Sequence, residues 1–148
     1  MINRIVEWFT SEKEIIESLD PNLATAVLLV EVSMSDNEWG TDEEIKIKEL
    51  LSLHLKLSED EQFEVLSAAK ELVLESNDLY RFTNQMNETL DTEAKYNLLV
   101  LLWQVAFADG EIDRYEDHII RKISELLYLH HSHFIKAKHQ AQELMGQI

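Results

Sequence analysis

The stretch that decides the fold is residues 107–116, which read FADGEIDRYE. An apolar run, residues 97–108, leads into it, and an amphipathic run follows it. Residues 34–43 read MSDNEWGTDE and lie between two runs of the same kind. The acids of the two stretches match at a constant spacing of 73 residues: Asp36 with Asp109, Glu38 with Glu111, and Glu43 with Glu116. The chain therefore carries a helix, an acidic loop and a second helix twice.

The repeat extends into the flanking helices. At the same spacing, Leu28, Leu29 and Val32 match Leu101, Leu102 and Val105, while Ile47, Leu50 and Leu53 match Ile120, Ile123 and Leu126. The first helix of each pair is apolar almost all round, so it must be buried. One repeat alone can hardly bury such a helix. We therefore expect two helix pairs about a pseudo-twofold axis, with the most apolar helices at the centre.

Composition and helix-start signals complete the fold prediction. The chain has 148 residues, 3 Gly, 1 Pro and 45% hydrophobic residues, which is typical of long helices with short connections. Helix starts are indicated at Asp20-Pro21, at the Ser58/Glu61 capping box, at Asp91 or Thr92, and at Ser132. The sequence predicts one all-α domain, 1–148: a compact bundle of seven to eight helices, with an amphipathic helix over residues 1–20 (Ile2, Ile5, Val6, Phe9) and repeats at about 23–75 and 94–146.

The charge restricts the partners. Acids outnumber bases 29 to 13, giving a formal net charge of −16. Such a surface repels nucleic acid and anionic lipid and attracts cations or basic proteins. There is no cysteine, hence no thiolate ligand, and neither a membrane span nor a signal peptide is evident. We expect a cytoplasmic monomer or homodimer without membrane insertion.

The acidic loops have two interpretations. As helix caps, Asp113 with Glu116 and Thr41 with Glu44 make capping boxes, and acids in a first turn suit the helix dipole. Caps do not explain Asp36 and Asp109, which end helices where a carboxylate is disfavoured. Carboxylates gathered with free carbonyls suit a hard cation, so Ca²⁺ or Mg²⁺ is favoured and Zn²⁺ is not excluded. The spacing does not fit an EF-hand.

The candidate ligands form one set. They are Asp36, Glu38, Glu43, Asp109, Glu111 and Glu116, with Glu31 and Asp113 as lesser candidates. Glu31 lies on a helix expected to be buried, so it needs a partner: a cation shared with Asp36, or Lys46 or Lys48.

Other motifs carry less. His130, His131 and His133 are of a type that binds transition metals, but adjacent histidines at a turn point apart. No nucleophile elbow, glycine-rich phosphate loop or zinc-protease motif is present, so we expect no enzyme. The loop residue Trp39 is a candidate partner-binding side chain.

With these residues in view, the chain resembles the TerB-like family, the tellurite-resistance protein B group, to which the N-terminal domain of the co-chaperone DjlA is related. The resemblance rests on residues 108–113 (ADGEID) with Glu116, on the copy at Asp36, Glu38 and Glu43, and on the duplicated helices. It implies an all-helical, non-enzymatic module associated with tellurite and other chemical stress, with a metal site in the acidic loops. The first repeat departs from the pattern, with Asn37 for Gly and Gly40 for Asp, which argues against a symmetrical two-metal site.

Two hypotheses follow. The first is a TerB-like stress-response module that binds a divalent cation through the two acidic loops. The second is an acidic protein-interaction adaptor that docks a basic protein and needs no metal.

Overall fold

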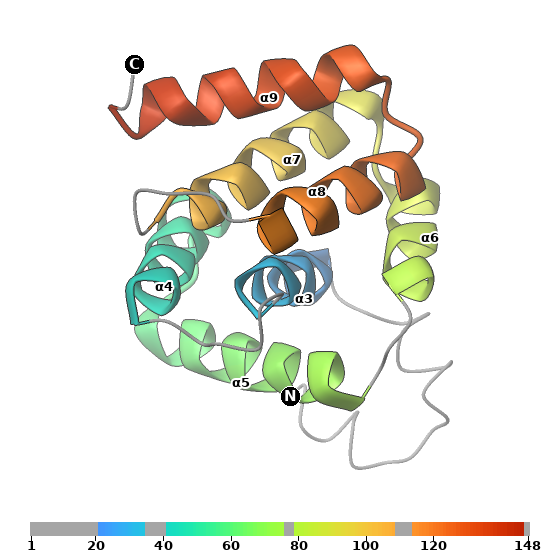
Figure 1. Cartoon of the computed structure of the whole chain (residues 1–148). Coiled ribbons are helices and arrows are strands. Elements are labelled where there is room, and N and C mark those ends of the chain that lie inside the picture. The colour runs from blue at the N-terminus through green and yellow to red at the C-terminus, as the bar shows by residue number, and fades with distance from the viewer. Residues whose placement is uncertain (1–20, 35–40, 76–78, 109–113, 147–148) are drawn as a thin grey trace.

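The computed structural model describes residues 21–34, 41–75, 79–108 and 114–146 (Figure 1). Within these ranges the chain is helical, with no strand. The seven helices are α3 (Pro21–Ser33), α4 (Thr41–Leu55), α5 (Glu59–Glu75), α6 (Leu79–Thr89), α7 (Thr92–Ala106), α8 (Arg114–Leu126) and α9 (His131–Leu144). The prediction of an all-α fold is confirmed. The amphipathic helix expected over residues 1–20 lies outside the described residues.

Helices α3 and α7 are the most apolar and pack against each other at the centre of the molecule (Figure 1). Most of their side chains are apolar, so burial among the surrounding helices is their stable arrangement. The fully buried side chains of the two helices include Val27, Leu28 and Leu29 of α3 and Leu99, Leu102 and Trp103 of α7.

The remaining helices surround this centre in matched pairs. Helix α3 packs against α5 as α7 packs against α9, and α3 contacts α4 as α7 contacts α8. Each second helix also crosses to the other repeat, α4 to α7 and α8 to α3. This is the packing of two pseudo-twofold-related repeats. Helix α6 alone stands outside the scheme and packs against α3 and α8, at the right-hand edge of Figure 1.

The helix starts test the capping predictions. The Ser58 box is confirmed: the Ser58 N–H donates to the Glu61 carboxylate at 2.9 Å, and the Glu61 N–H donates to Ser58 Oγ at 3.2 Å. At α7 the cap is Asp91, which accepts from the Ala94 N–H at 2.8 Å. The expected Ser132 cap of α9 is wrong. His130 takes that place because its Nδ1 accepts the Ser132 N–H at 3.1 Å.

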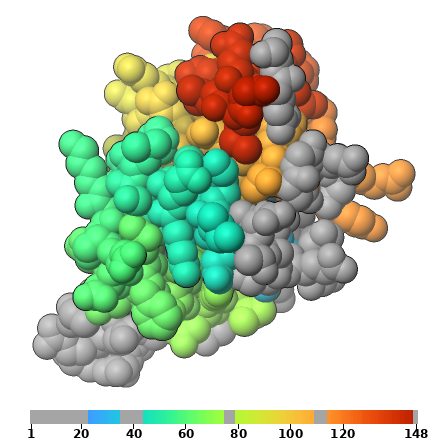
Figure 2. Space-filling model, turned by 90° about the vertical axis from the view of Figure 1, so that its left-hand side faces the viewer, coloured from blue at the N-terminus to red at the C-terminus, as the bar shows by residue number. Residues whose placement is uncertain are grey.

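Helix α4 buries a narrower face than the sequence suggests. Ile47, Leu50 and Leu51 are buried, whereas Leu53, which the repeat groups with Ile47 and Leu50, is exposed, as is Ile45. At 3.6 residues per turn, Ile45 lies on the opposite side of the helix from Ile47, and Leu53 lies on its flank, roughly 120° from Ile47. Figure 2 shows α4 at the surface between α5 and α9. Among the described residues, none of the helices combines the length and the apolar character that crossing a bilayer requires.

Candidate metal centre

Two of the eight carboxylates predicted as metal ligands have described side chains, Glu31 in α3 and Glu116 in α8. Glu43 lies in the first turn of α4, of which only the backbone is described there. Outside the described residues lie Asp36, Glu38, Asp109, Glu111 and Asp113, together with the predicted partner-binding Trp39.

Glu116 is a buried acid at the start of a helix. It lies in the first turn of α8 and is only 4% exposed. Acids in a first turn are ordinarily solvated, as Glu59 and Asp60 of α5 are. Burying a carboxylate is costly without compensating hydrogen bonds or charge, and the amide N–H groups and dipole of a helix start favour negative charge. Glu116 is thus far more buried than Glu59 and Asp60, which stand at the same place in α5.

Glu31 is a half-buried acid on the neighbouring helix. It lies in the last turn of α3, which packs against α8. Burial raises the pKa of its carboxyl group, and the positive charge of Lys122 opposes that rise. Lys122 follows Glu116 on α8 by six residues, about 9 Å along the helix axis. Across the contact between α3 and α8, the ammonium group of Lys122 therefore acts on the carboxyl group of Glu31.

The lysines that the sequence suggested as partners of Glu31 are engaged elsewhere. Lys46 pairs with Glu49 at 3.2 Å, and Lys48 lies 3.8 Å from Glu44. Both pairs are formed within α4, because residues three or four apart on a helix are neighbours. The positive charge that acts on Glu31 is that of Lys122 in α8. The prediction that Lys46 or Lys48 pairs with Glu31 is therefore wrong.

Glu44, the neighbour of the predicted ligand Glu43, ties two helices together. Its carboxylate accepts from Lys70 Nζ of α5 at 2.9 Å. The two side chains are about one-third exposed, so solvent screening keeps the contribution of this pair to stability small. Glu44 thus links α4 to α5. From the sequence, Glu44 is a predicted capping acid and not a predicted metal ligand, and this structural role agrees with that.

The repeat counterpart of Glu31 is Gln104 in α7, which has no charge. It is 8% exposed, and its Oε1 is buried without a hydrogen-bond partner. A neutral amide oxygen stabilises a bound cation far less than a carboxylate oxygen does. The two repeats are therefore chemically unequal at this position, in keeping with the expected asymmetry of the two loops.

Within the described ranges, no three His, Asp or Glu side chains gather closely enough to hold a metal ion. A complete ligand shell would need acids from residues 35–40 or 109–113. The donors available next to those residues are carboxylate oxygens, which fit a hard cation such as Ca²⁺ or Mg²⁺. The three histidines do not converge: His130 caps α9, His131 stacks on Phe134, and the His133 ring meets the Tyr96 ring edge-on.

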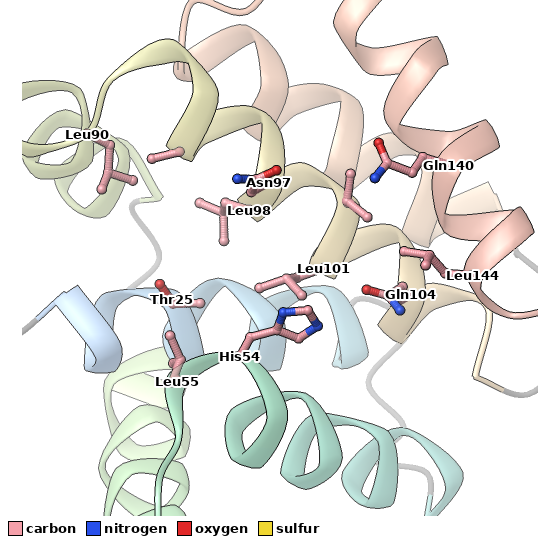
Figure 3. A pocket seen from close by; sticks show the side chains of 12 residues that line it. Thr25, His54, Leu55, Leu90, Asn97, Leu98, Leu101, Gln104, Gln140 and Leu144 are labelled. Carbon is pink, nitrogen blue, oxygen red and sulfur yellow. The ribbon is translucent and has the colours of Figure 1, made fainter.

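A hollow of about 460 Å³, which neither Glu31 nor Glu116 lines, lies between α3, α4, α7 and α9 (Figure 3). Its walls are mainly apolar, with Leu55, Leu98, Leu101 and Leu144 among the lining side chains. His54 is the one titratable residue among those that line it. Such a wall offers no pair of groups for acid–base chemistry.

An all-α protein built around two helix pairs, in each of which an acidic stretch joins the two helices, is the class that this fold and this site define. The family model described as tellurite resistance protein TerB matches residues 22–139. The chain belongs to the TerB family, and the resemblance drawn from the acidic stretches is confirmed. Comparison with curated proteins and with solved structures found no match.

Proposed function

We propose that this TerB-family, tellurite-resistance-associated module is non-enzymatic and binds a divalent cation at the start of α8. The ligands are Glu116 with Asp109, Glu111 and Asp113 from the adjoining loop, and Glu31 contributes from α3. Asp36, Glu38 and Glu43 form the corresponding acidic loop before α4 and bind more weakly. Ca²⁺ and Mg²⁺ are the favoured ions because every proposed side-chain donor is an oxygen.

The burial of Glu116 is the observation that carries the proposal. A carboxylate that is 4% exposed interacts more strongly with a nearby cation than an exposed one does, because water and salt screen it less. The raised pKa of Glu31 supports it further, because its desolvation exceeds what Lys122 offsets. A divalent ion bound by Glu31 would compensate the desolvation that Lys122 leaves.

Thermal melting tests the proposal. The chain is melted in EDTA and then with Ca²⁺, Mg²⁺ or Zn²⁺ at constant ionic strength. A specific site adds about 2.7 kcal/mol at roughly one hundred times its dissociation constant. The gain disappears in the Asp109→Asn/Glu116→Gln variant.

A matched variant separates binding from charge screening. Glu59→Gln/Asp60→Asn also removes two acids next to a helix start, but both side chains are exposed. It keeps the full gain if the site is specific. Equal gains in both double variants mean that the cation only screens the acidic surface, and the site proposal is then wrong.

A second candidate function, an acidic protein-interaction adaptor, is favoured by the outer face of α5. Phe63 and Leu74 are both exposed there, eleven residues apart and hence on one side of the helix. Glu59, Asp60 and Glu71 flank them and are exposed as well. A partner with basic and apolar side chains matches such a face. Phe63→Ser/Leu74→Ser would abolish this binding and leave the cation effect intact.

A further inference from the structure

The hollow of Figure 3 lies where the repeat symmetry requires a helix. Helix α6 covers the contact between α3 and α8. The equivalent contact in the other repeat is that between α7 and α4. Among the described residues, no helix covers α7 and α4 as α6 covers α3 and α8. The hollow opens there, lined by the end of α4 and one side of α7.

If a helix equivalent to α6 is missing from the contact between α4 and α7, residues there should be more exposed than their counterparts at the contact between α3 and α8. Leu127 is fully buried, whereas its counterpart His54 is exposed although it lies on the inward side of α4. Ala24 is buried and its counterpart Asn97 is exposed. Leu126 is partly buried against the core, whereas its counterpart Leu53 is 66% exposed.

The chain contains a segment that corresponds to α6. At the spacing of 73 residues, α6 corresponds to residues 6–16, VEWFTSEKEII. The buried residues of α6 are Leu79, Phe82, Thr83 and Met86. The counterparts of Leu79, Phe82 and Thr83 are Val6, Phe9 and Thr10, which are of the same kind. The counterpart of Met86 is Lys13. A lysine can lay its aliphatic stem along an apolar wall and keep its ammonium group in water.

The hollow, a groove between α4 and α7, is suited to residues 6–16. Its leucines offer an apolar wall. The buried Gln104 Oε1 has no hydrogen-bond donor, and the side chain of Trp8, Thr10 or Ser11 could supply one. Residue 16 precedes the start of α3 by five residues, which span up to about 18 Å. Thr25, one turn into α3, lines the hollow. The segment is thus tethered next to the groove, at a high effective concentration.

We propose that residues 6–16 form a helix that occupies the groove between α4 and α7 of the same chain, as the repeat counterpart of α6. The hollow is then the seat of this segment rather than a small-molecule pocket. Leu53 and His54 become covered, and the bundle gains the helix that makes its two repeats equivalent.

Cysteine cross-linking of the full chain tests the proposal, since the sequence has no cysteine of its own. In the other repeat, Asn87 Nδ2 donates to the Leu126 carbonyl oxygen at 2.9 Å. The equivalent pair is residue 14 with residue 53, so Glu14→Cys/Leu53→Cys is joined with a short bismaleimide linker. The control is Glu14→Cys/Glu125→Cys, whose second cysteine is exposed on α8, in the repeat that α6 already covers.

The expected result is a cross-linked monomer that forms at least tenfold faster in the first pair than in the control. Cross-linked dimers in place of monomers assign the groove to a second copy and overturn the proposal. Equal rates in both pairs, or none in either, overturn it as well.

A melting experiment gives an independent readout without cysteines. Phe9→Ala should lower Tm by roughly 5 °C or more, as expected when a buried aromatic side chain is truncated. Glu7→Ala, on the opposite side of the proposed helix, should leave Tm unchanged. A Phe9→Ala chain that melts with the wild type contradicts the docking.

Discussion

Glu31 of α3 is desolvated by burial and compensated only in part by Lys122 of α8. The two residues are 91 positions apart in the sequence and belong to different repeats. Their charges meet because α8 crosses from its own repeat to pack against α3. The electrostatics of the site are therefore a product of the repeat packing.

The raised pKa of Glu31 predicts how stability depends on pH. The folded chain holds a proton on Glu31 above pH 4.5, where the unfolded chain has lost it, so stability falls as pH rises through the folded pKa. Glu31→Gln removes this loss of stability at high pH, because glutamine carries no titrating proton. In EDTA, the variant should have a higher Tm than the wild type at pH 7 and an equal Tm below pH 4.5. A variant that is less stable at pH 7 would show that the charge of Glu31 stabilises the fold.

Lys122 tests the other side of the same pair. Lys122→Met removes the charge that opposes the desolvation of Glu31, so its pKa rises further. At pH 7 in EDTA, Tm should fall. In the Glu31→Gln background the same substitution should have little effect, because the two residues are coupled. Equal losses in both backgrounds would mean that Lys122 acts through other contacts.

The capping box of α5 gives a pH dependence of opposite sign. The hydrogen bonds from Ser58 lower the pKa of Glu61, so its charge stabilises the folded chain above pH 4.5. That contribution is lost as pH falls through the folded pKa. Glu61→Gln should be less stable than the wild type at pH 7, and the difference should vanish in acid. Glu71→Gln, an exposed change in the interior of the same helix, serves as the control for loss of charge.

The cap of the central helix α7 can be tested by substitution alone. Asp91→Ala removes the acceptor of the Ala94 N–H and should cost about 1 kcal/mol. For a chain of this length that lowers Tm by roughly 2–4 °C. Asp91→Ser should restore most of it, because serine also accepts at this position. If Thr92→Ala costs as much as Asp91→Ala, the cap is assigned to the wrong residue.

Helix-level features could be predicted from the sequence because they depend on neighbours. The caps at Ser58 and Asp91 and the apolar character of α3 and α7 follow from residues within one or two turns. The same local rules missed His130, since an imidazole nitrogen can take the place of a hydroxyl oxygen at a helix start. The repeat spacing extended the prediction to the pairing of whole helices.

The contacts between helices could not be predicted in this way. From the sequence, Lys46 or Lys48 is one of two suggested partners of Glu31, the other being a cation shared with Asp36. Periodicity gives the inward side of a helix and not the helix that this side meets, so Lys122 of α8 was missed. Likewise, nothing local separates the buried Glu116 from the exposed Glu59, since both stand in a first turn. The repeat, which pairs Glu116 with Glu43, and the family resemblance of residues 108–116 marked it as a candidate.

The most direct test of cation binding is isothermal titration calorimetry on the EDTA-treated chain. Ca²⁺ and Mg²⁺ are titrated in turn into the wild type, Glu116→Gln and the exposed control Glu59→Gln. We expect saturable binding of at least one of the two ions by the wild type and the control, and an affinity for that ion at least about tenfold weaker in Glu116→Gln, a loss of about 1.4 kcal/mol. No saturable heat with either ion in the wild type, or the same dissociation constant in all three proteins, would contradict a metal centre at Glu116.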